Sequence, residues 1–220
     1  MDAVRRELLN RHGTTYAEEL RINLARETPS ALFKLLVGAI LFSARIGARQ
    51  GTRAARALFS EGWTSAGKLA GATWEERVRV LNGNGYARYD ERTSTMLGEA
   101  SEMLMERYRG DLRKLREEAG RDPGRERALL RQVKGLGNVG IDIFFREVQV
   151  AWDELYPFAD ERALAEARRL GLPGDPKALA RGHDPQAFAT LVAALVRSSL
   201  SKDRDEILQA AGQVTPRPSG

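Results

Sequence analysis

The stretch that decides the fold runs from Val133 to Asp160 and reads VKGLGNVGIDIFFREVQVAWDELYPFAD. It opens with the glycine-rich turn GLGNVG, and it follows RERALLRQV, a run with helical periodicity. Gly135 and Gly137 permit the backbone angles of a tight turn, which residues with a Cβ resist. Asn138 then fits as the N-cap of a second helix, whose apolar residues recur at helical spacing. The stretch therefore predicts a helix, a short glycine hairpin and a second helix.

The start of that second helix is a candidate binding site for anions. Its first backbone N–H groups have no partner inside the helix, and the commonest polymer of anions is a nucleic-acid backbone. A net charge of +5 and a pI near 9.7 favour the same kind of partner. Charged residues of both signs are interleaved, however, so much of the charge belongs to a solvated helical surface.

The composition points to an all-α protein of one domain or two small lobes. Ala, Leu, Arg and Glu dominate the 220 residues, and runs of β-branched residues are short. The longest apolar run, Leu35 to Phe42, is too short to cross a membrane. The first residues lack the apolar block of a signal peptide, so we expect a cytoplasmic, nucleoid-associated protein. There are no cysteines, which excludes disulfides.

The residues of the hairpin carry a resemblance to a known family. VKGLGNVG resembles the helix-hairpin-helix of the endonuclease III-like DNA glycosylases, the helix-hairpin-helix/Gly-Pro-Asp superfamily. In that family a catalytic Asp follows the hairpin and opens a helix, and Asp160 in ADERALAEARRLGLP matches it. SALFKLLVGAILFSARIGARQGTRAARALF resembles the family's first barrel helices, and GYARYDERTSTMLGEASEMLMERYRGDLRKLRE resembles its middle ones. The resemblance covers roughly Thr28 to Pro173.

The resemblance implies a two-lobed helical fold of the DNA glycosylase type. Residues 28–151 would form a helical barrel that includes the hairpin at 133–140. Residues 1–27 and 152–220 would form the second lobe, and the flipped nucleotide would lie between the lobes. Helices are expected at Asp2–His12, Ala31–Ala44 with Pro29 in its first turn, Gly51–Phe59, Ser65–Leu69, Thr73–Leu81, Asp90–Tyr108, Leu112–Ala119 and Gln186–Ala211.

The implied function is base-excision repair, with Asp160 as the catalytic residue. Breaking an N-glycosidic bond builds positive charge on the sugar, which a carboxylate stabilises while it positions or deprotonates water. In bifunctional members a Lys near the position of Val139 attacks the sugar, and a valine cannot form that Schiff base. We therefore expect a monofunctional glycosylase that leaves an abasic site. One alternative is a lyase that uses another amine. The other is a non-catalytic DNA-binding protein, in which Asp160 would act only as a helix cap.

The partner implied is duplex DNA that contains a damaged base, bound by a monomer. The hairpin would contact phosphate through Lys134, Gly135, Leu136, Gly137, Asn138, Val139 and Gly140. Arg45 would fill the gap left by the extruded base, Tyr86 would enter the base stack, and Arg88 would also contact the DNA. Each has a structural alternative: Arg45 as a cation near a helix end, Tyr86 as a packed aromatic, and Lys134 as an exposed loop residue. Trp152, Tyr156 and Phe158 are the aromatic residues expected in the base pocket.

No cofactor is expected apart from a structural monovalent cation on the carbonyls of the hairpin turn. The iron–sulfur cluster of many relatives needs four thiolates, which this sequence lacks. His12 and His183 belong to no metal-ligand pattern, so we expect both at the surface. Asp142 and Glu147 lie on the second hairpin helix and are expected to be surface charges or local ion-pair partners.

Overall fold

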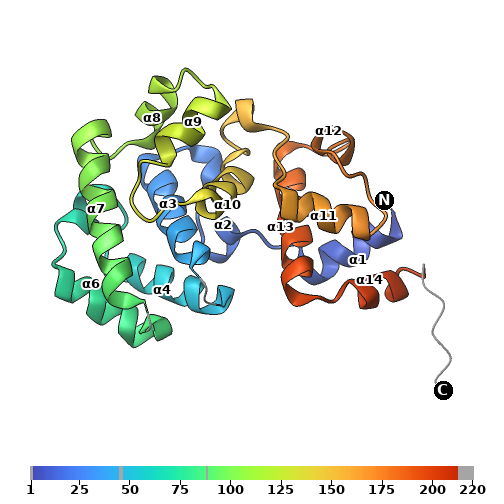
Figure 1. Cartoon of the computed structure of the whole chain (residues 1–220), viewed down its shortest axis with the longest axis horizontal. Coiled ribbons are helices and arrows are strands. Elements are labelled where there is room, and N and C mark those ends of the chain that lie inside the picture. The colour runs from blue at the N-terminus through green and yellow to red at the C-terminus, as the bar shows by residue number, and fades with distance from the viewer. Residues whose placement is uncertain (1, 45–46, 88, 213–220) are drawn as a thin grey trace. The chain divides into compact units, whose positions relative to one another are not determined.

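The chain folds into helices arranged in two compact units. The computed structural model describes residues 2–44, 47–87 and 89–212, and every regular element in these ranges is a helix or a helical turn (Figure 1). The all-α prediction is confirmed. We call Tyr16–Glu154 the hairpin unit, and Met1–Thr15 with Leu155–Gly220 the terminal unit. In the part of the chain that the structure describes, no helix has the length and apolar character needed to span a membrane.

The hairpin unit is built around helix α3, which is buried along most of its length. Thr28 caps its N-terminus by accepting a hydrogen bond from the Ala31 amide at 3.2 Å, and Pro29 occupies the first turn as predicted. α3 packs against α4 and α10, so the second hairpin helix lies directly on the core. The helices of this unit are α2 (Tyr16–Glu19), η1 (Leu24–Arg26), α3 (Pro29–Ser43), α4 (Ala48–Ser60), α5 (Ala66–Ala70), α6 (Trp74–Leu81), η2 (Asn82–Tyr86), α7 (Asp90–Tyr108), α8 (Leu112–Glu118), α9 (Pro123–Leu130) and α10 (Asn138–Val148).

The hairpin unit begins at Tyr16, whereas the sequence analysis places the barrel boundary at Thr28. The carboxylate of Glu147 on α10 accepts hydrogen bonds from the backbone amides of Tyr16 at 3.1 Å and Ala17 at 3.0 Å. The ring of Tyr16 also stacks on Phe42, with the ring centroids 4.0 Å apart. Glu147 is only 4% exposed, so the expectation of a surface charge is wrong for this residue.

A buried arginine fixes the end of the hairpin unit. Arg116 of α8 donates to Glu154 at 2.6 Å and to Asp153 at 2.7 Å, both in η3 (Asp153–Leu155), and to Glu27 at 2.9 Å. These hydrogen bonds raise the pKa of Arg116 and keep it charged at every ordinary pH. The guanidinium thereby joins α8 to the segment that leads toward Asp160.

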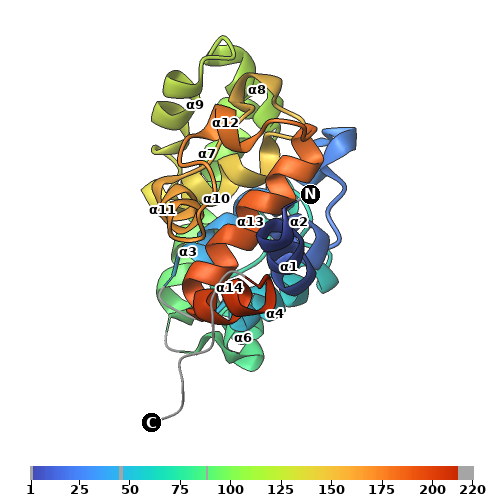
Figure 2. The same ribbon diagram turned by 90° about the vertical axis from the view of Figure 1, so that its right-hand side faces the viewer.

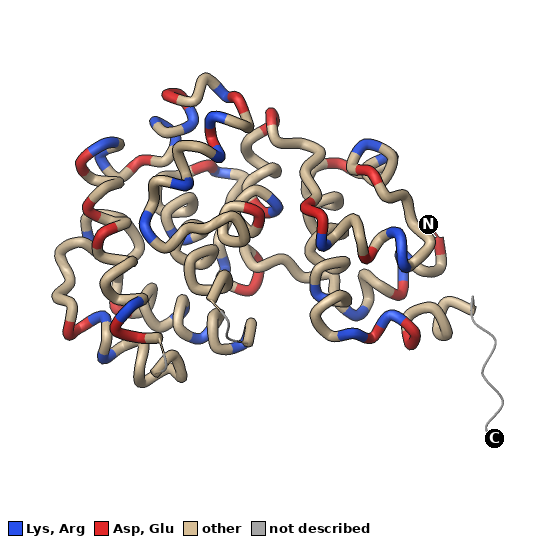
Figure 3. The backbone as a smooth tube through the Cα atoms, in the orientation of Figure 1, with Lys and Arg blue, Asp and Glu red and all other residues tan. Residues whose placement is uncertain are grey.

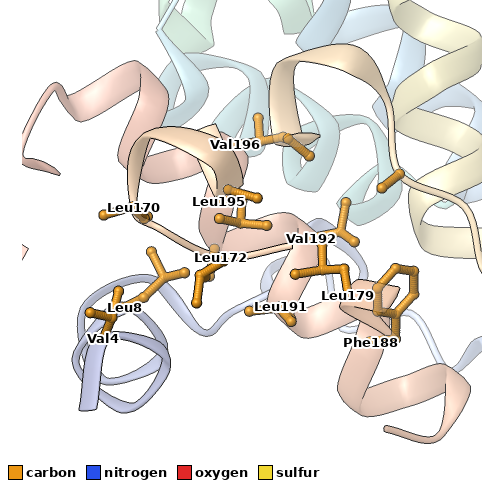
Figure 4. Packing of buried hydrophobic residues seen from close by; sticks show 14 of the residues in the cluster. Val4, Leu8, Leu170, Leu172, Leu179, Phe188, Leu191, Val192, Leu195 and Val196 are labelled. Atoms are coloured by element: carbon orange, nitrogen blue, oxygen red, sulfur yellow. The ribbon is translucent and has the colours of Figure 1, made fainter. Parts of the chain in front are cut away.

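The terminal unit has a separate apolar core. Its helices are α1 (Ala3–His12), α11 (Glu161–Arg169), α12 (Pro176–Leu179), α13 (Pro185–Ser201) and α14 (Arg204–Ala210). α1 lies beside α13 in both views (Figure 1, Figure 2). Val4 and Leu8 of α1 meet Leu191 and Leu195 of α13 in one buried cluster, to which α11 and α12 also contribute (Figure 4).

The predicted helix Gln186–Ala211 is two helices in the structure. α13 ends at Ser201, and Lys202 adopts the left-handed conformation with φ 59° before α14 begins at Arg204. Asp203 then accepts a hydrogen bond from the His12 ring at 2.6 Å. The break therefore brings a carboxylate to α1, and it makes His12 a partly buried partner instead of the surface residue expected.

Candidate nucleic-acid interface and catalytic aspartate

The predicted hairpin is present between α9 and α10. The Val133 amide donates to the Leu130 carbonyl at 3.0 Å, and the Leu136 amide donates to the Val133 carbonyl at 3.1 Å. These two bonds turn the chain back on itself, and Leu136 is buried at 3% exposure. The turn is thus anchored by its own apolar residue, while its outer edge stays open to solvent.

Two of the hairpin glycines are closely packed by neighbouring side chains. Gly135 has φ +81°, and a Cβ there would lie 3.1 Å from the Met96 side chain. A Cβ on Gly140 would lie 2.8 Å from a terminal methyl of Leu136 and 3.4 Å from the Ala39 carbonyl, so a larger residue there would require the Leu136 side chain to shift.

Gly137 plays a different part from the one expected. Its φ of −79° and ψ of −177° are extended angles that any residue adopts, and a Cβ there would meet nothing within 4 Å. Gly137 is also the N-cap of α10, with no side-chain cap, so the prediction that Asn138 caps this helix is wrong. Since no side chain covers the helix start, its amides remain accessible.

The N-terminus of α10 exposes backbone N–H groups. Gly137, Asn138 and Val139 are exposed, and no acceptor for their amides is found among the described residues. Unsatisfied amides at a helix N-terminus, together with the helix dipole, attract phosphate. Val139 is 62% exposed, so its side chain takes no part in the core.

A hollow of about 570 Å³ lies beside the hairpin, within the hairpin unit. It is bounded by the end of α3, the first turns of α7 and the turn 131–137. Arg92, Arg131 and Lys134 line it, and the Lys134 ammonium lies 3.5 Å from the Glu99 carboxylate. Elsewhere the two signs of charge alternate along the chain (Figure 3). The hairpin therefore lies next to a local excess of positive charge.

Asp160 is the N-cap residue of α11 in the terminal unit. Its carboxylate accepts a hydrogen bond from the Ala163 amide at 3.1 Å, as a helix N-cap does. The side chain is half-buried, and one oxygen is engaged in the cap. A carboxylate has further lone pairs, so a cap role and a catalytic role are compatible.

The aromatic residues expected in the base pocket lie in different environments. Trp152 is fully buried, edge-on to Phe144 with centroids 5.5 Å apart, so its assignment to the pocket is wrong. The hydroxyl of Tyr156 donates to the His183 carbonyl at 2.7 Å, which ties its ring to the core of the terminal unit. Phe158 is half-buried.

The predicted wedge is also corrected. Tyr86 is 1% exposed, and its hydroxyl donates to the Leu41 carbonyl at 2.9 Å. Burial raises the pKa of this hydroxyl to about 12. An anchored ring of this kind cannot enter a base stack, so the alternative of a packed aromatic holds. Arg45 and Arg88 lie outside the described residues.

The histidines and acids offer no metal site in the part of the chain described. No group of three or more His, Asp or Glu side chains there could hold a metal ion. His183 lies 3.3 Å from the Arg5 guanidinium and is partly buried, not at the surface as expected. Burial and the nearby Arg5 charge lower its pKa. A monovalent cation on the carbonyls of the hairpin stays a prediction.

Sequence reasoning missed a buried acid close to the hairpin. Glu126 of α9 has no solvent exposure, and it lies against Glu154. Its spacing from Leu129 and Leu130 indicates helix but gives no sign of burial. The approach of α8 and η3 buries it, and no pattern within α9 encodes that approach.

No family model and no curated protein matches the sequence. Among solved structures, the chain is similar to an endonuclease III in a trapped covalent DNA intermediate, described as an estranged-adenine complex. The likeness has a TM-score of 0.49 and 19% identity, and it covers 76% of this chain and 73% of that one.

Proposed function

We propose that the protein is a DNA glycosylase that binds duplex DNA through the hairpin and hydrolyses the N-glycosidic bond of a damaged base with Asp160. The observation that carries the proposal is the hairpin, where the exposed amides of Gly137, Asn138 and Val139 lie next to Arg92 and Arg131, which have no acidic partner among the described residues. Neutral donors in a fixed geometry bind phosphate without reading sequence, which suits an enzyme that must search any DNA.

Asp160 supplies the chemistry in this proposal. The base has to leave the duplex to be reached, and extrusion is least costly for a damaged or mismatched one. The bond between C1′ and the base nitrogen then breaks, and the base departs with the electron pair. A water molecule adds to C1′ and gives up a proton. A carboxylate beside C1′ stabilises the positive charge and orients the water.

The absence of an amine at position 139 favours hydrolysis over strand cleavage. Val139 is exposed on the first turn of α10, where bifunctional members of the resembled family carry their lysine. Lys134 is 63% exposed and lies near Glu99, so a role in charge neutralisation suits it better than nucleophilic attack. The product would be an abasic site in an intact strand. The enzyme would work as a monomer on nucleoid DNA in the cytoplasm.

Substitution of Asp160 by Asn tests the proposal. Asparagine caps helices as well as aspartate does, so α11 should remain folded while the charge is lost. We expect Asp160→Asn to abolish base release and to leave DNA affinity and melting temperature close to those of the parent protein. Base release at an unchanged rate would refute the role of Asp160.

A non-catalytic DNA-binding protein is the second candidate. The hydrogen bond from the Ala163 amide gives Asp160 a structural reason to be there, without any chemistry. Such a protein would bind damaged duplexes and release no base from any of them. Trapping of a protein–DNA adduct by borohydride would instead favour a lyase, because only a Schiff base can be reduced in that way.

A further inference from the structure

The hollow beside the hairpin combines cations with an aromatic ring. Arg92 and Arg131 both line it, both are exposed, and neither has an acidic partner among the described residues. Arg116, by contrast, is engaged by the carboxylate of Glu154. Two guanidiniums left without partners on one hollow favour a ligand with more than one negative charge.

The aromatic ring in the hollow belongs to Tyr89, at the start of α7. It is half-buried, and its centroid lies 6.5 Å from that of Tyr86 in an edge-on arrangement. Tyr86 is held in turn by its hydroxyl bond to Leu41. Tyr89 therefore rests against a fixed neighbour, as a stacking platform requires.

Apolar side chains complete the lining. Ile40, Met96 and Leu136 contribute to the same hollow, whose volume of about 570 Å³ lies in the range of small-molecule sites. Phosphate alone needs neither an aromatic ring nor apolar contacts. A nucleotide needs both, because its base is flat and apolar on its faces while its phosphates are charged.

We propose that this hollow binds an unpaired nucleotide of a DNA strand, with its base on Tyr89 and the adjoining phosphates on Arg92 and Arg131. The inference rests on the proposed function in one respect, since it takes the hairpin and the hollow to contact the same DNA. It concerns undamaged nucleotides and involves no step at Asp160. The consequence is a preference for DNA in which a base is already unpaired.

The test uses two fluorescently labelled duplexes without any damaged base, one fully paired and one with a single unpaired adenine. Binding of the full-length protein is measured by anisotropy over a series of salt concentrations. We expect the bulged duplex to bind about tenfold more tightly than the paired one, because its unpaired base can stack on Tyr89. Tyr89→Ala should remove that preference, and Tyr89→Phe should retain it because the ring is kept.

The arginines are tested in the same assay. Arg92→Gln and Arg131→Gln should each weaken binding and lower the slope of log affinity against log salt by about 0.9 on duplex DNA. Arg79→Gln is the matched control, because Arg79 is exposed on α6 in the same unit and does not line the hollow. It should leave affinity and slope unchanged.

The outcomes separate this inference from the proposed function. Equal binding of both duplexes by the parent protein, or a preference that survives Tyr89→Ala, would overturn the nucleotide site alone. Failure to bind either duplex would overturn both proposals. Unchanged salt slopes for Arg92→Gln and Arg131→Gln would show that these arginines do not contact phosphate, which contradicts the inference.

Discussion

Glu126 of α9 is fully buried beside Glu154 inside the hairpin unit, although both are acids. No donor among the described residues reaches either oxygen of Glu126, so a negative charge on this buried carboxyl would have no compensating partner. Burial, and then the contact with Glu154, raise the pKa of Glu126 to about 8. Burial opposes the charged form of Glu154 as well, but hydrogen bonds from Arg116 outweigh it and lower that pKa to about 2. Glu126 therefore holds the proton at neutral pH.

This pair predicts that the protein loses stability as the pH rises. The pKa of Glu126 is higher in the folded chain than in the unfolded one, so its stabilising effect is complete below the unfolded value and is lost as the pH passes about 8. We expect the free energy of unfolding to fall by on the order of 1 kcal/mol per pH unit between about pH 6 and pH 8.

Denaturant unfolding at a series of pH values measures this effect. Glu126→Gln keeps the shape of the protonated acid and cannot ionise, so its unfolding free energy should stay nearly constant over the same range. Glu117→Gln, an exposed position on α8, serves as the control and should follow the parent protein. Parallel pH profiles for the parent protein and Glu126→Gln would show that Glu126 is not the titrating group.

The hairpin amide of Gly137 is expected to contribute directly to DNA binding. Its φ of −79° suits proline and the space around it is empty, so Gly137→Pro should remove the N–H with little change in shape. We expect affinity to fall by roughly tenfold for every duplex alike, as for loss of one hydrogen bond to a charged group, and the salt dependence to become flatter. Gly137→Ala keeps the donor and should bind more tightly than the proline variant. An equal loss in both variants would mean that the amide is not the contact.

A lysine at position 139 is predicted to introduce lyase chemistry. The first turn of α10 exposes Val139, so Val139→Lys should fold normally and offer an amine near the position of the lysine in bifunctional members of the resembled family. Borohydride should then trap an adduct between the variant and an abasic duplex. Asn138→Lys is the matched control, because it places the same amine one residue away on the same turn. Adducts at equal yield in the two variants would point to nonspecific amine chemistry.

Two acids of α10 are predicted to differ in their contribution to stability. Glu147 is buried and accepts two backbone amides at 3.1 and 3.0 Å, so Glu147→Ala should cost about 2 kcal/mol through the unsatisfied donors. Asp142 forms an ion pair with Arg127 at 2.7 Å, with both side chains 30% exposed. Asp142→Ala should therefore cost less than about 1 kcal/mol. Denaturant unfolding compares the two, and equal losses would contradict the burial argument.

Local sequence patterns predicted the helices and the hairpin well, because caps, glycine turns and apolar spacing act within a few residues. Pro29 marked the first turn of α3, and Gly135 marked the tight turn. Patterns failed where burial is decided by distant segments. Nothing near Tyr86 in the sequence indicates that its hydroxyl reaches Leu41, and nothing near Glu126 indicates the approach of Glu154.

The aromatic assignments failed for the same reason. Trp152 lies only eight residues before Asp160 in the sequence, yet it is part of the core, and the Arg116 guanidinium carbon lies 5.6 Å from its ring. Its distance in residues from the candidate catalytic acid carried no information about its environment. Resemblance to a family gave the order of the elements, whereas side-chain roles depended on contacts between elements.

We propose above that this protein releases a damaged base by hydrolysis and leaves the strand intact. Its most direct test incubates the protein with a panel of end-labelled duplexes that carry deaminated, oxidised or alkylated bases, and examines each strand before and after treatment with alkali. We predict that at least one duplex is cut only after alkali, because an abasic site forms without strand cleavage. Intact strands throughout the panel after alkali, or strand cleavage before it, would contradict the account.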